Sequence, residues 1–174
     1  MGHHMKTLAI VQARMCSTRF PNKVMLPIND VPLIELLLHL LSLAKLIDHI
    51  MVATSIASGD KQLAAHVRSL NYEVFEGSEN NVLDRFYKAA LPHRPNMVVK
   101  IAGDCPLVDP ELVGAIIASF APRHVDYLTE IRQPSQMVWI RKCTHKARWK
   151  LDEPADLAVV DAVFRHFGPR INFG

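Results

Sequence analysis

A regular alternation of short apolar runs with segments of helical periodicity constrains the fold more than any other feature of the sequence. Four apolar runs, rich in branched side chains, predict buried strands at residues 7–13, 49–54, 72–75 and 96–102. Helices are predicted behind them at residues 31–47, 60–70, 81–90 and 110–120. This repeated strand–helix order predicts a Rossmann-like three-layer α/β domain with a mostly parallel sheet. Ligands are then expected in the loops at the carboxyl ends of the strands, after Ala13, Thr54 and Gly103.

The pattern is looser beyond residue 120. Strands are predicted at residues 125–128 and 137–141, followed by a final amphipathic helix at 153–167. Asp152 is expected to cap that last helix, because a short side chain with an acceptor oxygen satisfies the free amides of a first turn. By the same reasoning, Asp30 is expected to cap the first helix.

Composition limits the class of protein. The chain has 174 residues, 49% of them hydrophobic, and one domain is expected over residues 6–174, with residues 1–5 the remnant of an expression tag. A formal charge of +3 implies no nucleic-acid partner. The most apolar stretch, residues 32–47, is interrupted by polar side chains and too short for a membrane span. The three cysteines form no CxxC pair, so a cytoplasmic location is expected.

The loop after the first strand is rich in groups that bind anions. It carries the cations Arg14, Arg19 and Lys23, and the hydroxyls of Ser17 and Thr18. Such groups neutralise phosphates and donate hydrogen bonds to their oxygens. The position at a strand's carboxyl end favours phosphate binding over the alternative, a solvated basic loop. The loop holds no glycine, which excludes the GxxxxGK[ST] and GxGxxG motifs.

This loop and several later segments resemble the motifs of a known enzyme family. The loop reads QARMCSTRFPNKVMLP, where the family pattern is QARMGSTRLPGKVLLP. Further matching segments are VATS (52–55), FEGS (75–78), VLDRFY (82–87), GDCPLVDP (103–110) and RWKLDEPADL (148–157). The chain thus resembles the spore-coat polysaccharide biosynthesis type of cytidylyltransferases, relatives of the CMP-sialic acid and CMP-deoxy-manno-octulosonate synthetases. The resemblance implies the nucleotidyltransferase, or nucleotide-diphospho-sugar transferase, variety of the three-layer fold.

The resemblance also implies a reaction. A sugar, sugar phosphate or sugar acid attacks the α-phosphate of CTP and pyrophosphate leaves, in the synthesis of a surface polysaccharide or glycoconjugate. Such a transfer needs cations around the triphosphate, and Mg²⁺ to offset charge on the leaving group. By the family's pattern, Arg14 and Lys23 stabilise the phosphates, while the Ala13 backbone, Ser78 and Arg85 lie near the base and ribose.

Two aspartates match the family's magnesium ligands. Asp104 follows the fourth strand and Asp152 precedes the last helix. Mg²⁺ takes oxygen ligands, commonly from only one or two carboxylates. The alternative for Asp104 is a helix cap or a turn former, although Asp109 already supplies the cap of the next helix. The alternative for Asp152 is the helix cap, and one carboxylate can fill both roles.

The sequence departs from the family at two places. Cys16 and Asn22 stand where the family's loop has glycine; asparagine tolerates a left-handed backbone, and cysteine does so poorly. Residues 128–147 form a shortened version of an insertion that, in relatives, carries acceptor contacts and much of the dimer contact. The acceptor sugar, the nucleobase and a homodimer therefore stay open.

Two other functions remain as alternatives. Cys16, Asn22 and the shortened insertion favour a degenerate, non-catalytic nucleotide-binding module. A nucleotide-sugar-dependent glycosyltransferase usually carries an Asp-x-Asp pair after a strand, whereas Asp104 is followed here by Cys105 and Pro106. The cysteines are interpreted as packing residues. The histidines, His49 and His93 among them, show no metal-ligand spacing and are interpreted as surface or packing residues.

Overall fold

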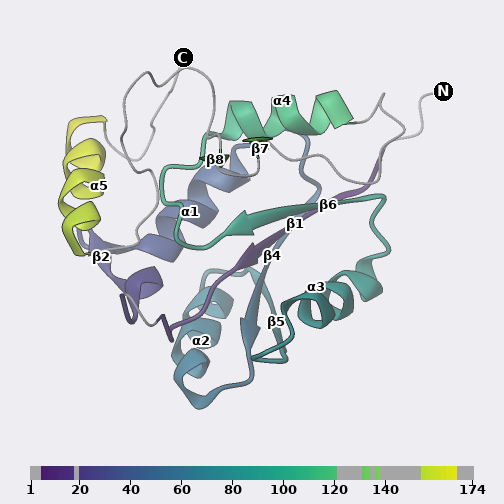
Figure 1. Ribbon diagram of the computed structural model, residues 1–174, viewed down its shortest axis with the longest axis horizontal. Helices are drawn as coiled ribbons and strands as arrows, with labels where there is room; N and C mark the ends of the chain where they lie inside the picture. The colour runs from purple at the N-terminus through teal and green to yellow at the C-terminus, as the bar shows by residue number, and fades with distance from the viewer. Residues whose placement is uncertain (1–4, 18–19, 121–130, 134–135, 138–153, 168–174) are drawn as a thin grey trace.

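A four-stranded parallel sheet forms the centre of the molecule. The computed structural model describes residues 5–17, 20–120, 131–133, 136–137 and 154–167 (Figure 1). The strands are β1 (Thr7–Gln12), β4 (His49–Ser55), β5 (Glu73–Gly77) and β6 (Met97–Ala102). They lie in the order β5-β4-β1-β6, and every neighbouring pair is parallel. The predicted α/β class and parallel sheet are therefore confirmed.

Helices cover both faces of this sheet. They are α1 (Leu33–Ser42), α2 (Lys61–Ser69), α3 (Val82–Ala90), α4 (Pro110–Phe120) and α5 (Pro154–Phe167). Helices α1, α2 and α4 pack in one apolar cluster with Ala9, Val11 and Val52 of the sheet. Helix α3 packs on the opposite face, against Leu8 and Ile10. Alternate residues of β1 thus face two helical layers, which is why its sequence is a continuous apolar run.

The first predicted helix was too long at both ends. Its expected start instead forms a hairpin of β2 (Pro27–Ile28) with β3 (Val31–Pro32). Asn29 and Asp30 make the turn with φ angles of 47° and 65°, the left-handed pair that a two-residue hairpin requires. Asp30 is therefore a turn residue and not a helix cap, so that prediction was wrong. The helix ends at Ser42 rather than Ile47.

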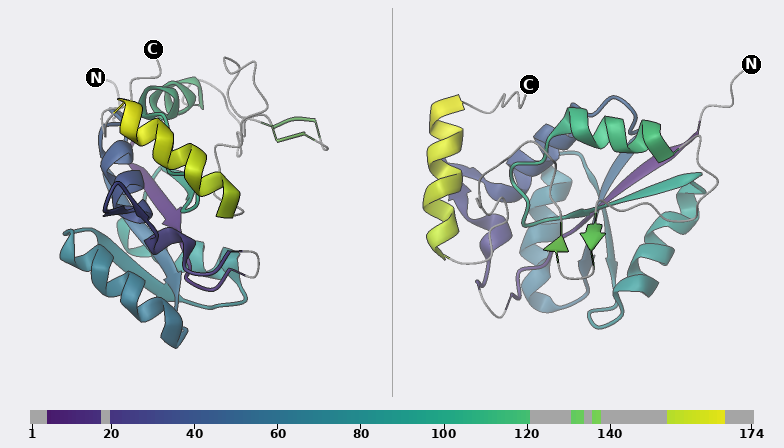
Figure 2. Two further views of the ribbon diagram at one scale, coloured as in Figure 1. Left: turned by 90° about the vertical axis from the view of Figure 1, so that its left-hand side faces the viewer. Right: turned by 45° about the horizontal axis from the view of Figure 1, so that its top comes forward.

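Helix α5 lies beside α1 and the hairpin (Figure 2). Its Val160 and Phe164 are buried with Ile28 and with Leu33 of α1 in a second apolar cluster. The predicted helix at 153–167 agrees with its bounds to one residue. The predicted strand at 125–128 lies outside the described residues, as do residues 138–141 of the next one. Within the latter, only Met137 is described, in β8 (Gln136–Met137), which pairs with β7 (Ile131–Gln133). The single-domain boundaries stay a prediction.

Candidate functional site

The carboxyl ends of the four strands meet at one edge of the sheet. Gln12 of β1 is level with Ala53 of β4 on one side and with Ala102 of β6 on the other. The loops that leave these strands therefore start side by side. Gly103 lets the β6 loop lie against β1, since a Cβ there would sit 2.8 Å from the Gln12 carbonyl oxygen.

Lys23 and Asp104 form an ion pair across this edge. Lys23 opens the 3₁₀ turn η1 (Lys23–Met25) after the β1 loop, and Asp104 follows β6. Their Nζ and Oδ2 atoms are 2.6 Å apart, and the side chains are 10% and 14% exposed. Because β1 and β6 are neighbours, two residues 81 positions apart meet here. The structure thus brings together a predicted phosphate ligand and a predicted metal ligand.

Backbone geometry accounts for the loop's departures from the family pattern. Asn22 precedes η1 with a φ of 58°, in the left-handed region where the family uses glycine. Asparagine is among the residues that adopt this conformation most readily. Cys16 is exposed and is not among the described residues with positive φ. Its Cβ therefore needs no strained backbone, and the cysteine is compatible with the loop as folded.

A buried aspartate that sequence reasoning missed holds the β1 loop in place. Asp60 closes the 3₁₀ turn η2 (Ser58–Asp60) and is almost fully buried. Its Oδ1 accepts a 2.6 Å hydrogen bond from the Met15 amide, and its Oδ2 accepts from the amide and hydroxyl of Ser55. One carboxylate thereby joins the β1 loop to the end of β4. No sequence signal marked this role, because Asp60 was assigned to the start of the second helix.

Arg85 lies buried beside the same edge. The side chain, on α3, is fully enclosed, and its Nη1 donates a 2.6 Å hydrogen bond to the Ser78 carbonyl oxygen. Its Nε and Nη2 atoms are buried with no hydrogen-bond partner among the described residues. Burial and the nearby charge of Arg14 lower the pKa of Arg85, whereas Asp60 acts to raise it. Two donors of a buried guanidinium are thus available to an acceptor.

The remaining predicted residues have different placements. Arg14 lies in the β1 loop and donates to the Glu79 carbonyl oxygen at 3.2 Å. Ala13 is buried, and its amide faces the Ala53 carbonyl oxygen at 3.4 Å. The Ser17 hydroxyl accepts a hydrogen bond from the Phe20 amide within the loop. Three predicted residues lie outside the described part of the chain: Thr18, Arg19 and Asp152.

Comparison with known proteins establishes the family. A family model described as Cytidylyltransferase matches residues 8–146. The chain belongs to the cytidylyltransferase family. It is 37% identical over 131 residues to the spore coat polysaccharide biosynthesis protein SpsF of Bacillus subtilis, covering 73% of this chain and 55% of that protein. It is 32% identical over 122 residues to a 3-deoxy-manno-octulosonate cytidylyltransferase of Zea mays, covering 68% and 40%.

A solved structure agrees with this assignment. A cytidylyltransferase from Leptospira borgpetersenii superposes with a TM-score of 0.66 at 30% identity, covering 70% of this chain and 51% of that one. The resemblance noted from the motifs and the nucleotidyltransferase fold are therefore confirmed. The chain spans about half the length of these relatives. Among the described helices, none has the length and apolar character needed to cross a bilayer.

Proposed function

We propose that the chain transfers CMP from CTP to a sugar or sugar acid, with release of pyrophosphate. The observation that carries the proposal is the Lys23–Asp104 pair at the carboxyl edge of β1 and β6. In an open parallel sheet, ligands bind in the crevice outside these strand ends, where neighbouring strands connect in opposite directions. Strands β1 and β6 are such neighbours, because the chain runs outward from β1 through β4 to β5 and then returns past β1 to β6, the last strand on that side among the described residues.

The site supplies positive charge where a triphosphate would lie. Lys23 and Arg14 come from the β1 loop, and Arg85 reaches the same edge from α3. In the ligand-free chain, the Lys23 ammonium is neutralised by Asp104. A bound triphosphate offers it a second anion, and the lysine can donate to both without leaving this edge of the sheet. Charge on the leaving pyrophosphate is then stabilised by groups already in position.

The residues present fit a divalent cation. Asp104 places a carboxylate at the carboxyl edge of the sheet, and its 2.6 Å contact with the Lys23 ammonium is consistent with a cation at this position. Carboxylate oxygens are the ligands that Mg²⁺ prefers. Asp104, together with Asp152, would hold Mg²⁺, which when bound would offset charge on the triphosphate. This chain's own part is to keep the carboxylate fixed beside Lys23.

The names of the relatives support the class of acceptor. One acts in spore coat polysaccharide biosynthesis and another on 3-deoxy-manno-octulosonate, so we propose a sugar or sugar acid destined for a polysaccharide or glycoconjugate. No described side chain stands out as a general base. A phosphate oxygen of the acceptor is already ionised and needs mainly positioning, whereas an attacking sugar hydroxyl releases its proton to water as the bond to the α-phosphorus forms and pyrophosphate leaves.

Pyrophosphate release tests the proposal. The chain is incubated with CTP, Mg²⁺ and a panel of sugars, sugar phosphates and sugar acids, with ATP, GTP and UTP as nucleotide controls. We expect release with CTP and one class of acceptor. Asp104→Asn is expected to abolish metal-dependent release. Lys23→Ala is expected to weaken CTP binding about tenfold to a hundredfold, because a charge-assisted hydrogen bond is lost.

A control variant tests whether the effect of Lys23→Ala depends on the position of the lysine or only on the loss of one positive charge. Lys45→Ala removes an exposed lysine between α1 and β4, at the amino edge of the sheet, and is expected to leave CTP binding unchanged. CTP binding without release in the presence of every acceptor would favour the non-catalytic module. Indifference to all four nucleoside triphosphates would overturn the proposal.

A further inference from the structure

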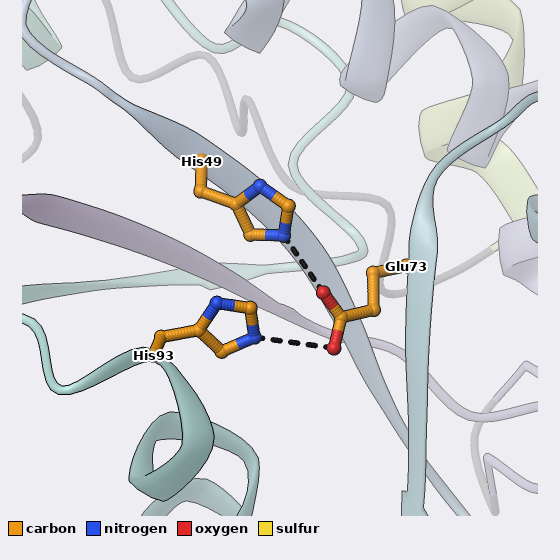
Figure 3. Close-up of side chains that lie close together, drawn as sticks. All are labelled: His49, Glu73 and His93. Carbon is orange, nitrogen blue, oxygen red and sulfur yellow. Dashed lines mark hydrogen bonds and ion pairs between the residues drawn. The ribbon is translucent and has the colours of Figure 1, made fainter.

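Two histidines and a glutamate converge at the edge of the sheet opposite the nucleotide site (Figure 3). His49 is the first residue of β4, Glu73 is the first residue of β5, and His93 ends the 3₁₀ turn η3 (Leu91–His93) that follows α3. The His49 Nε2 atom is 2.8 Å from Oε2 of Glu73. The His93 Nε2 atom is 3.1 Å from Oε1 of the same carboxylate. Each imidazole thus faces its own oxygen.

This trio is separate from the nucleotide site. Because the strands are parallel, the first residues of β4 and β5 lie at the amino edge of the sheet, and Ser55 ends β4 at the carboxyl edge. A strand rises about 3.3 Å per residue, so the seven residues of β4 separate the two edges by roughly 20 Å. None of the three side chains is within reach of Lys23 or Asp104.

The spacing of the three donor atoms suits a metal ion. All three lie within 4.8 Å of one another. Donors around a tetrahedral Zn²⁺, each about 2.0–2.1 Å from the metal, are roughly 3.3 Å apart. The two contacts to Glu73, 2.8 and 3.1 Å, are a few tenths of an ångström below that spacing. No pair of donor atoms exceeds 4.8 Å, so side-chain rotation can bring all three around one ion. The ligand set is therefore close to assembled before any ion binds.

Neighbouring interactions keep the trio in place. The two imidazole rings stack with centroids 4.7 Å apart, so both present Nε2 on the same side. Lys6 donates a 2.7 Å hydrogen bond from Nζ to the His93 carbonyl oxygen, which ties η3 to the chain entering β1. His49 and Glu73 are 40% and 44% exposed and His93 is 16% exposed. An ion can reach the site from solvent and keep a water ligand.

The donor types decide which cation is favoured. Imidazole nitrogen is a borderline-soft donor that suits Zn²⁺, Cu²⁺, Ni²⁺ and Co²⁺, whereas Mg²⁺ takes oxygen ligands. Two imidazoles and one carboxylate with an open position form a three-ligand set common in zinc sites. We propose that His49, Glu73 and His93 bind a divalent transition-metal ion, Zn²⁺ in the first instance, and so fasten together the starts of β4 and β5 and the end of η3.

Calorimetric titration with Zn²⁺ tests the site. The full chain is used with His3 and His4 replaced by alanine, since the paired histidines near the N-terminus can bind zinc themselves. We expect one Zn²⁺ per chain. His49→Gln, Glu73→Gln and His93→Gln are each expected to weaken binding by at least about tenfold, the loss seen even for outer-sphere partners of metal ligands. His39→Gln, an exposed histidine on α1, is the matched control and should bind as the parent does.

Two further measurements distinguish coordination by the three side chains from non-specific metal binding. Co²⁺ in place of Zn²⁺ should give the visible absorption of a low-coordinate nitrogen and oxygen site in the parent, and it should be lost in Glu73→Gln. Zn²⁺ should raise the melting temperature of the parent and of His39→Gln but not that of the three ligand variants. Circular dichroism checks that each variant is folded. Absence of saturable binding, or equal affinity in parent and ligand variants, would show that the trio is only hydrogen-bonded.

Discussion

Asp60 shows how one buried carboxylate can fix the conformation of a loop. Its two oxygens face the Met15 amide on one side and Ser55 on the other. Both partners are fixed backbone donors, so the group that joins them must accept on both sides. A carboxylate does this, and its desolvation is offset by the hydrogen bonds it receives. The β1 loop that carries Arg14 and leads to Lys23 is positioned as a consequence.

We predict that Asp60→Asn destabilises the chain by about 1–3 kcal/mol, because the amide NH₂ must face a buried N–H donor. Urea unfolding measures the loss. CTP binding should weaken in the same variant, since Met15 is no longer held. Asp84→Asn, which removes a carboxylate that pairs with Lys88 on the surface of α3, should change stability by less than about 1 kcal/mol. Equal stability of Asp60→Asn and the parent would contradict the positioning role.

Arg85 differs from Asp60 in that it is a buried charge whose hydrogen bonds are incomplete. Nη1 has the Ser78 carbonyl, while Nε and Nη2 have no partner in the described part of the chain. A buried charge without a full set of hydrogen bonds carries a desolvation cost that an apolar side chain of similar volume does not. We predict that Arg85→Met keeps the free energy of unfolding within about 1 kcal/mol of the parent or raises it. CTP affinity, measured by calorimetry, should fall in the same variant.

The reverse result would be informative for Arg85. A loss of several kcal/mol on Arg85→Met, with CTP affinity unchanged, would mean that the guanidinium is structural. Arg68→Met is the matched control, because Arg68 pairs with Glu76 at an exposed position on α2 and its loss should affect neither property strongly.

At the scale of elements, the β2–β3 hairpin distinguishes two interpretations of one residue. A helix cap at Asp30 would lose a few tenths of a kcal/mol on replacement by glycine. If Asp30 is instead a turn residue with a φ of 65°, replacement by glycine should stabilise the chain, because glycine enters the left-handed region without a steric penalty. We predict that Asp30→Gly raises the free energy of unfolding by about 0.5–1 kcal/mol, measured in urea. A loss in that measurement would favour the cap.

The hairpin also shows which elements sequence reasoning finds. The strands of the sheet were predicted because burial on both faces leaves continuous apolar runs, as in β1. Asp109 was correctly predicted as a cap, and its Oδ1 accepts from the amides of Glu111 and Leu112. The hairpin was missed because two-residue strands have no periodicity, and Pro32 fits a helix start equally well.

The candidate site was predictable only in part for a related reason. Lys23 and Asp104 follow from strand order and family motifs, whereas Asp60 and the His49–Glu73–His93 trio depend on contacts between distant segments. Met51 is the register partner of Glu73, so His49 lies two residues before that pairing and reaches Glu73 diagonally. Nothing in the spacing of His49, Glu73 and His93 reveals such a meeting.

At the scale of the whole molecule, the parallel sheet keeps two kinds of polar cluster apart. Every strand starts at one edge and ends at the other, so residues that follow strands gather at the carboxyl edge and residues that begin them gather at the amino edge. Lys23 and the Asp104 carboxylate lie at the carboxyl edge, and the His49–Glu73–His93 trio lies at the amino edge. Between them lie the buried apolar residues 8–11 of β1 and 51–53 of β4. Changes at one edge should therefore leave the other unaffected.

A double-mutant cycle tests this independence. Asp60→Asn acts at the carboxyl edge and Glu73→Gln at the amino edge. We expect the Glu73→Gln change alone to be small, about 1 kcal/mol or less, since the carboxylate is exposed and screened. The two changes in unfolding free energy, measured in urea with chelator present, should add within about 0.3–0.5 kcal/mol, as they do for sites without shared partners. A coupling term above about 1 kcal/mol would mean that the sheet transmits strain between its edges. In that case, metal binding at the amino edge would also be expected to alter nucleotide affinity at the other.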